Sequence, residues 1–376
     1  MQIKKLQLLT LPLLIFTFSC NSATRLFSEK TAHEKYAEEI SDTEEGKQWI
    51  AVSKSTLEMP HHIELPYSQV GYFPHNKPKA LTLLFTVKQG EKITIDLSKK
   101  TDSGFVMYAD VFQKKGTATA YIQSADSLQT QFSLTANETS TYLLRLQPEL
   151  YQKGSYGLSI SVAPSLEFPV AGDKAKAGSF WGADRDGGKR RHEGVDIFAP
   201  KLTPAIAAAD GYITSVQEGG LGGKTVWMRV SDRNISLYYA HLDKQLVEAG
   251  QRVKKGDTLG LVGNTGNARF TPSHLHFGIY NYHGAVDPWP FVNQTIKKAG
   301  EVKPKELDTY LQWKKPKTKA SHDELLIPLA ITNKNYIAEL ADGKIIAAPF
   351  DAVKQIKING RSGEVVSETQ SSSTGG

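Results

Sequence analysis

The stretch "TPSHLHFGIY" at residues 271–280 carries two histidines one residue apart in a run that otherwise has the character of a β-strand. Side chains alternate between the two faces of a strand. His274 and His276 are therefore expected on one face, and Leu275 and Phe277 on the other. The apolar face predicts a core. The other face brings two imidazoles together, where they could bind a metal ion or move protons.

A second group of candidate ligands lies in "RRHEGVDIFAP", which contains His192 and Asp196. Catalytic zinc is typically held by three His, Asp or Glu side chains and keeps one position open. His192, Asp196 and His276 form such a set. An extended strand would place the first two Cα atoms about 13 Å apart, too far for one ion, so the chain is expected to bend there. Gly194 is the residue expected to permit the bend.

Two further histidines are available for proton transfer. His241 lies in "YYAHLD", and His274 lies about 6.6 Å along the strand from His276. A zinc ion lowers the pKa of its bound water to about 7, and a neutral imidazole nearby can take a proton from that water or stabilise an oxyanion. We therefore predict that His276 binds the metal and that His274 works beside it.

Four segments in this order resemble the lysostaphin-type (LytM-like) zinc peptidases, a family of Gly-Gly and peptidoglycan endopeptidases. They are "FWGADRDGGKRRHEGVDIFAP", "LYYAHLD", "GQRVKKGDTLGLVGNTG" and "SHLHFGIY". The resemblance spans roughly residues 165 to 295. It implies Zn²⁺ as cofactor, His192, Asp196 and His276 as ligands, and His241 and His274 as catalytic histidines. The segment "ARFTPS" departs from the shorter linker common in the family.

The resemblance also implies peptides of bacterial peptidoglycan as the substrate, cleaved in the stem or the cross-link. Arg191, in the run "KRR", is a candidate for binding stem-peptide carboxylates, although a solvated charge run explains it equally well. Tyr238 and Tyr239 are candidates for orienting substrate, although strand packing explains them equally well. The bond cleaved, any inhibition by flanking domains and the oligomeric state are left open.

Two other functions compete with hydrolysis. Some relatives of such peptidases have lost ligands and bind and activate another cell-wall hydrolase, which would give this chain a regulatory protein partner. All five site positions are filled here, which favours an active enzyme. The segment "GQRVKKGDTLGLVG" also resembles the half-motif of biotinyl or lipoyl carrier domains, but a carrier leaves the histidines unexplained.

The site requires a scaffold, and the pattern of the chain predicts a mainly β, multi-domain protein. Seven short alternating strands between residues 64 and 165 predict an antiparallel, jelly-roll-like β-sandwich that serves as a binding or positioning domain. Capping-box spacing of Thr31 and Glu34 predicts a short helix, and a second helix is expected from about 46 to 57. The predicted domains are a signal peptide at 1–20, a tether with short helices at 21–60, the sandwich at 64–165, a compact antiparallel zinc peptidase domain at 166–297, a small β module at 305–360 and a disordered tail at 361–376.

Composition narrows the partners. The chain has 376 residues, of which 40% are hydrophobic and 22% charged, and a formal net charge of +6. The length predicts two to three domains. The positive charge is spread along the chain without a basic stripe, zinc finger or helix-turn-helix pattern, so we predict no nucleic-acid partner.

The N-terminus "MQIKKLQLLTLPLLIFTFSC" has the basic start and short apolar run of an export signal. It ends at Cys20, the only cysteine in the chain, and "TFSC" resembles a bacterial lipobox in which Phe18 is larger than usual. We expect lipidation of Cys20 and a lipid anchor in the cell envelope. Asn21 is compatible with the outer membrane, facing the periplasm. The alternative is an ordinary signal peptide with a chance cysteine.

Overall fold

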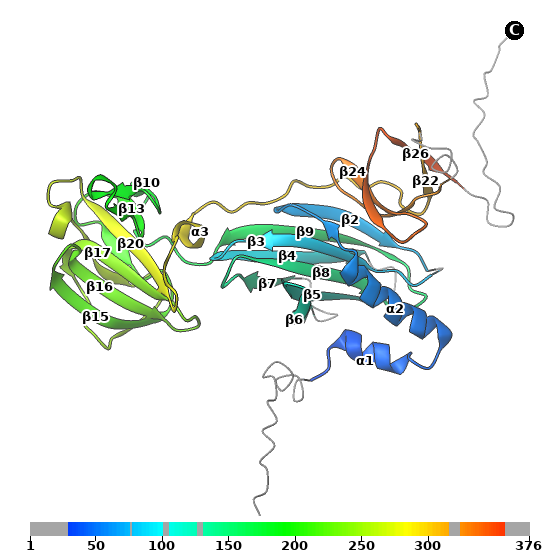
Figure 1. The fold of residues 1–376 in the computed structure, drawn as a ribbon, viewed down its shortest axis with the longest axis horizontal. Coiled ribbons are helices and arrows are strands. Elements are labelled where there is room, and N and C mark those ends of the chain that lie inside the picture. Colours follow the sequence, from blue (N-terminus) through cyan, green and yellow to red (C-terminus); the bar gives the residue numbers. More distant parts are fainter. Residues whose placement is uncertain (1–28, 76, 101–104, 126–130, 316–323, 358–376) are drawn as a thin grey trace, which may run out of the picture.

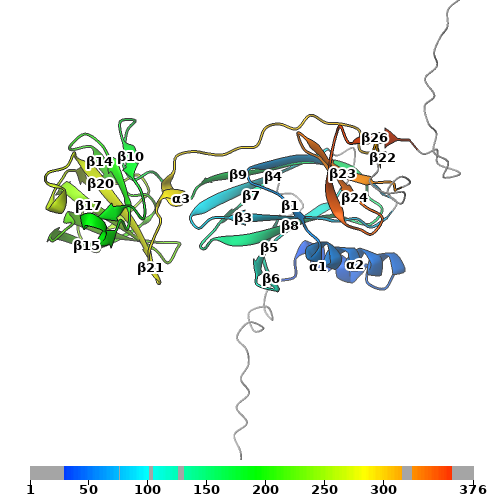
Figure 2. The ribbon, with the colours of Figure 1, turned by 45° about the horizontal axis from the view of Figure 1, so that its top comes forward.

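The computed structural model describes residues 29–75, 77–100, 105–125, 131–315 and 324–357. The molecule is elongated and mainly β, as predicted (Figure 1). A β-sandwich occupies the middle, a second β-domain lies at one end, and the last strands lie at the other end (Figures 1 and 2).

Some predictions fall on residues that the structure does not describe. The signal peptide with Cys20 and the tail 361–376 lie outside the described residues. In the part of the chain that the structure does describe, none of the helices has the length and hydropathy needed to span a bilayer.

The sandwich is an eight-stranded jelly roll with one additional short strand. One sheet has the order β1-β3-β8-β5-β6 and the other contains β2-β9-β4-β7. Within the eight strands β2 to β9, the first pairs with the last, the second with the seventh, the third with the sixth and the fourth with the fifth. This nested pairing is that of a long hairpin folded over into two sheets, as in jelly rolls. The strands are β1 (His61–His62), β2 (Tyr67–Phe73), β3 (Leu81–Val87), β4 (Glu91–Lys100), β5 (Met107–Lys115), β6 (Ala118–Ala125), β7 (Gln131–Thr135), β8 (Ser140–Pro148) and β9 (Gly154–Pro164).

The seven strands predicted between residues 64 and 165 correspond to β3 through β9. Their inward side chains, among them Leu83, Phe85, Ile93 and Ile95, are fully or almost fully buried in one core between the sheets. The prediction missed β1 and β2. Strand β1 pairs with β3 in parallel, so the sandwich is antiparallel except at β1.

Two helices brace one sheet of the sandwich (Figure 1). They are α1 (Ala32–Glu39), which begins with the predicted Thr31–Glu34 capping box, and α2 (Glu44–Glu58). Trp49 of α2 is completely buried, and its indole N–H donates a 2.7 Å hydrogen bond to the carbonyl oxygen of Pro148. His33 of α1 stacks on Trp49 with ring centroids 4.5 Å apart.

A buried polar network fastens these helices to β8. The His33 Nε2–H donates a 2.7 Å hydrogen bond to Gln147, and the amide of Gln147 donates to the carbonyl oxygen of Trp49. Beside it, Arg145 and Asp110 form a buried ion pair at 2.6 Å. Buried polar groups are costly unless they are paired, so this network favours a single docked position of the helices.

The strands described between residues 305 and 357 are joined to the sandwich. Strands β23 to β25 extend the β2 sheet to seven strands, because β23 pairs with the otherwise free edge of β2 at Val70 and Gly71. Strands β22 and β26 pair separately. These elements share a small core with the segment that precedes them. Their bounds are β22 (Tyr310–Trp313), β23 (Ile327–Ile331), β24 (Asn335–Glu339), β25 (Ile345–Pro349) and β26 (Val353–Ile356).

The second β-domain is built around an antiparallel sheet with the order β10-β13-β20-β17-β16-β15-β18. Strand β19 pairs with both β14 and β17, and β21 pairs with β20. The inner face carries one aliphatic and aromatic core. The elements are β10 (Lys176–Ser179), β11 (Asp184–Arg185), β12 (Arg190–Arg191), β13 (Val195–Phe198), β14 (Pro204–Ile206), β15 (Gly211–Gly219), β16 (Gly223–Val230), β17 (Ser236–Gln245), β18 (Arg252–Val253), β19 (Thr258–Val262), β20 (His274–Asn281), β21 (Gly284–Val286) and α3 (Trp289–Val292).

Helix α3 joins the second β-domain to the sandwich. Phe291 packs so closely on Gly90 of the sandwich that a Cβ there would lie 2.3 Å from its ring. The Phe291 carbonyl oxygen accepts a 2.8 Å hydrogen bond from the Leu166 N–H, and an isolated bridge pairs Val162 with Lys297. These contacts tie the segments on both sides of the domain to one end of the sandwich.

We predict that docking of the helices weakens in mild acid. Burial is the main cause that lowers the pKa of His33, aided by the charge of Arg145. The unfolded chain, with a histidine pKa of about 6.5, therefore binds the proton more readily. The stabilisation is complete above about pH 6.5 and is lost as the pH falls toward the lower pKa of the folded state.

The measurement is thermal unfolding followed by tryptophan fluorescence between pH 7.5 and 5. The wild type is expected to lose more stability over this range than His33→Gln, which keeps a hydrogen-bonding side chain but cannot titrate. An equal loss of stability in the two proteins between pH 7.5 and 5 would contradict the prediction.

Candidate active site

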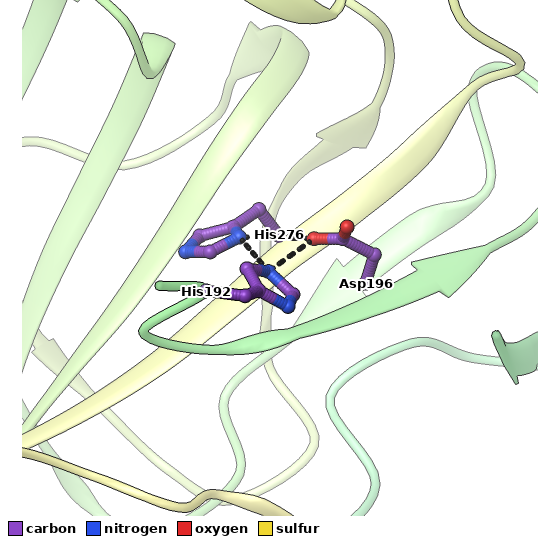
Figure 3. Close-up of side chains that lie close together, drawn as sticks. All are labelled: His192, Asp196 and His276. Carbon is purple, nitrogen blue, oxygen red and sulfur yellow. Dashed lines mark hydrogen bonds and ion pairs between the residues drawn. The ribbon is translucent and has the colours of Figure 1, made fainter. Parts of the chain in front are cut away.

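Three side chains from two distant parts of the sequence, His192 and Asp196 on one and His276 on the other, converge at one point of the second β-domain (Figure 3). The His192 Nε2 lies 3.0 Å from Asp196 Oδ1 and 3.0 Å from His276 Nδ1, and the last two atoms are 2.9 Å apart. These are the three predicted metal ligands. Among the described residues, they form the one group whose ligand atoms lie close enough together to hold a metal ion.

Strand pairing places two of the three ligands. Asp196 of β13 lies directly opposite His276 of β20 in the antiparallel register, and directly opposed residues point to the same face with their side chains in contact range. The predicted alternation along β20 is confirmed. Leu275 and Phe277 are completely buried in the core, and His276 faces the other side.

His192 follows a short hairpin made of β11 and β12. Its backbone N–H donates to the Ala183 carbonyl, and its own carbonyl accepts from the Gly182 N–H. The predicted bend between His192 and Asp196 is present, since β13 begins only at Val195. The close approach of the His276 ring explains the glycine at 194. A Cβ there would lie 2.6 Å from His276 Cε1 and 2.8 Å from the Phe277 carbonyl oxygen.

The hydrogen-bonding pattern shows why this cluster fits a cation. His192 Nδ1 lies 3.0 Å from the Phe180 carbonyl oxygen, which can only accept, so Nδ1 carries the hydrogen and Nε2 presents a lone pair. That lone pair faces a carboxylate oxygen, which also only accepts. Two acceptors 3.0 Å apart repel each other unless a positive charge lies between them. The donor set therefore suits a divalent metal ion.

The distances agree with a small tetrahedral ion. Zinc–ligand distances of about 2.0–2.1 Å separate neighbouring ligand atoms by about 3.3 Å. The observed triangle has edges of 2.9–3.0 Å.

The two predicted catalytic histidines lie beside the three ligands. The ring centroid of His241 is 5.0 Å from that of His274 and 5.9 Å from that of His276. Each Nδ1 lies 2.9 Å from a backbone carbonyl oxygen, that of Thr265 for His241 and that of Pro272 for His274. Each Nδ1 therefore carries the hydrogen, and each Nε2 keeps a lone pair for chemistry.

His241 reaches the site because β17 is irregular. Regular alternation would place it on the same face as Tyr239, in the core. Its φ of 62° is a left-handed conformation, uncommon for a residue other than glycine, and the pairing register shifts around it. Bulges commonly redirect side chains next to active sites. Burial, together with the charges of His274 and His276, lowers the pKa of His241 to about 4, so its ring is neutral at pH 7.

The structure contradicts one substrate prediction. Tyr239 is completely buried, and its hydroxyl oxygen accepts a 3.0 Å hydrogen bond from the Ala208 N–H. It packs edge-on against Phe277 in the core, so it cannot touch a substrate. The adjacent Tyr238, on the opposite face of β17, lines the cleft instead.

The cluster lies in a cleft of about 800 Å³ whose lining comes entirely from residues 179–280. Arg191 lies in the lining and pairs with Asp184. The unusual segment "ARFTPS", residues 268–273, forms part of another wall, and the N–H of Asn267 just before it donates to the Leu221 carbonyl. Phe270 on this segment is 87% exposed and is covered on one side by the guanidinium of Arg269.

Sequence reasoning missed Arg185. Its guanidinium Nη2 donates to Asp196 Oδ2 at 2.8 Å and to Ser179 Oγ at 2.7 Å. Nothing in the local pattern "ADRDGG" distinguishes this arginine from its charged neighbours. Only the folded hairpin brings it to the ligand.

Comparison with known proteins agrees with this geometry. Residues 190–288 match the model of "Peptidase family M23". This part of the chain is an M23 peptidase domain.

Two relatives illustrate the similarity of the M23 domain to bacterial proteins. The chain is 41% identical over 88 residues to the peptidoglycan DD-endopeptidase ShyC of Vibrio cholerae, covering 23% of this chain and 20% of ShyC. It is 35% identical over 124 residues to an L-Ala–D-Glu endopeptidase of Bacillus subtilis, covering 30% and 38% of the two chains. The chain thus spans well under half the length of these relatives.

Among solved structures, the chain is 33% identical to the catalytic domain of lysostaphin from Staphylococcus simulans. The match covers 31% of this chain and 90% of that one, with a TM-score of 0.29.

We predict that Gly194→Ala disrupts the M23 metal site. The added methyl group would overlap the His276 ring and push it away from Asp196. Metal affinity is expected to fall about tenfold or more, the scale seen when an orienting contact of a ligand is lost. Competition with a chromophoric chelator measures the dissociation constant.

Gly300→Ala is the matched control, because a Cβ at Gly300 meets only the Asn333 amide, at 3.3 Å. It should bind metal like the wild type. Wild-type affinity in Gly194→Ala would show that the close approach at this glycine does not position His276.

Proposed function

We propose that the protein is a zinc-dependent endopeptidase that hydrolyses peptide bonds in the stem or cross-link peptides of bacterial peptidoglycan. The observation that carries the proposal is the convergence of three lone-pair donors, His192, Asp196 and His276, beside two imidazoles in one cleft. A bound zinc ion would polarise the scissile carbonyl and lower the pKa of a water molecule towards about 7.

The chain's own residues supply the proton transfer. His241 and His274 each present Nε2 as an acceptor because each Nδ1–H is committed to a backbone carbonyl. A neutral imidazole in this state can accept the proton of the attacking water and later return it to the leaving amine. The low pKa of His241 keeps this ring in the accepting form at neutral pH.

Several features support peptidoglycan peptides as the substrate class. ShyC and the Bacillus subtilis relative are named as endopeptidases, and the name of ShyC specifies peptidoglycan. The cleft is lined by Arg190 and Arg191 as well as Tyr238. Guanidinium groups suit the carboxylates of stem peptides, which supports the prediction that Arg191 binds substrate.

The test is digestion of purified sacculi, with products identified by mass spectrometry. The wild type should release peptide fragments, and activity should disappear on metal removal and return with Zn²⁺. Asp196→Ala should bind little zinc and release nothing. His241→Ala and His274→Ala should keep near-stoichiometric zinc but lose about 10²- to 10⁴-fold in rate, the usual contribution of general acid–base groups.

Two results of this experiment would contradict the proposed enzymatic function. Equal fragment release by the wild type and Asp196→Ala would show that the cluster is not the active centre. A folded, zinc-free wild type that releases nothing would favour the scaffold, whose partner would be a second cell-wall hydrolase.

We also propose that the protein is a lipoprotein of the bacterial cell envelope, anchored through Cys20 and facing the periplasm from the outer membrane. The support is the sequence "TFSC" after a short apolar run, with Asn21 following. Acyl chains anchor a protein by about 0.8 kcal/mol per buried methylene.

We predict that wild-type protein incorporates an alkyne-tagged fatty acid in cells and sediments with outer-membrane fractions. Cys20→Ser should lose the label, because it removes the acceptor thiol. An unlabelled, soluble wild type would instead support an ordinary signal peptide.

A further inference from the structure

The two carboxylate oxygens of Asp196 have different partners. Oδ1 lies 3.0 Å from His192 Nε2 and 2.9 Å from His276 Nδ1, within the ligand cluster. Oδ2 points away from the cluster and accepts a 2.8 Å hydrogen bond from the guanidinium of Arg185. Such charge-assisted bonds are among the stronger hydrogen bonds in proteins.

Arg185 is itself held in place by the fold. The same Nη2 that binds Asp196 also donates to Ser179 Oγ at 2.7 Å, and Nη1 contacts the Asp184 carbonyl at 3.3 Å. Ser179 lies opposite Asp196 in the β10–β13 pairing, just after a register shift. The arginine is therefore bound to the carboxylate and to the strand beside it.

The hairpin that carries Arg185 also leads to a ligand. Arg185 of β11 is paired with Arg190 of β12, two residues before His192. Movement of this hairpin would shift the arginine and the histidine ligand together. The Arg185 side chain is 28% exposed and lines the cleft, so it forms part of the site wall.

We propose that Arg185 is a positioning residue that keeps Asp196 a one-oxygen ligand. A free carboxylate can bind an ion through both oxygens, and the second oxygen would then occupy a coordination position. With Oδ2 engaged by Arg185, only Oδ1 is available, and a position stays open for water and the scissile carbonyl. The inference rests on the proposed metal site, and it assigns to Arg185 a role separate from binding substrate.

A purely structural ion pair and a positioning contact can be distinguished by what their loss changes. Loss of a structural pair lowers stability and leaves the coordination of a bound ion unchanged. Loss of the positioning contact changes the number of ligand atoms, even in a variant that is folded and fully loaded. Co²⁺ in place of zinc reports this directly, because its visible absorption bands are stronger in four-coordinate than in five- or six-coordinate sites.

The experiment compares the Co²⁺-loaded full-length wild type with Arg185→Met, Arg185→Lys and Ser179→Ala. Arg185→Met, of similar length but uncharged, is expected to bind one Co²⁺ with weakened visible bands. Its zinc-dependent kcat should fall by about tenfold to a hundredfold, the effect typical of groups that orient a ligand, with a smaller change in KM. Arg185→Lys should partly restore the spectrum, since its ammonium can still reach the carboxylate. Ser179→Ala, a milder change, should give an intermediate spectrum.

Arg191→Met is the matched control for the spectrum. It removes a guanidinium from the same hairpin, but that group pairs with Asp184 and not with a ligand. Its Co²⁺ bands should equal those of the wild type, whatever its effect on KM.

The outcomes separate the two proposals. Wild-type Co²⁺ bands in folded Arg185→Met and in Ser179→Ala would overturn the role of Arg185. Weakened bands in Arg185→Met that Arg185→Lys partly restores would support that role, even if no protein digests sacculi. In that last case the peptidoglycan endopeptidase proposal fails and the positioning role stands.

Discussion

The candidate active site depends on one constraint, which is that electron-pair donor atoms from three side chains are held close together at one point. His192 Nε2 and Asp196 Oδ1 are both acceptors, yet they lie 3.0 Å apart. A bound cation makes such an arrangement favourable, and the fold provides the rigidity to hold it. The cross-strand register of β13 and β20 aligns Asp196 with His276, and the core beneath them is close-packed. The site is thus built mainly on paired strands, which define positions more narrowly than loops do.

Local irregularity supplies what regular strands cannot. A regular β17 would direct His241 into the core beside Tyr239, and a left-handed residue with a shifted register brings it to the cleft. Such backbone conformations cost about 1–3 kcal/mol and persist only where the surroundings compensate. Here the His241 N–H donates to the Gly222 carbonyl and the ring N–H donates to the Thr265 carbonyl. The second of these hydrogen bonds also sets the tautomer of the ring.

The flanking parts of the chain hold the M23 domain without entering its cleft. The jelly roll is connected to it through Phe291 and the segment around Ser165, and the described residues outside 179–280 contribute nothing to the cleft lining. The helices lie on the sandwich, where the buried contacts of Trp49 and His33 fix them (Figure 1). In this arrangement, the described parts of the sandwich and of the C-terminal strands leave the site accessible from solvent.

The sequence by itself determined the candidate ligands, the alternation of His274 and His276, and seven strands of the sandwich, because strand periodicity and turn residues are local properties. Tertiary structure decided the rest. Tyr239 faces the core and His241 the cleft because a bulge shifts the alternation, and local patterns do not locate a bulge. The pairing of β23 with β2 and the contact of Arg185 with Asp196 form only when separate segments of the chain come together. The residues of one segment do not indicate which other segment they will contact, so these hydrogen bonds are seen only in the folded chain.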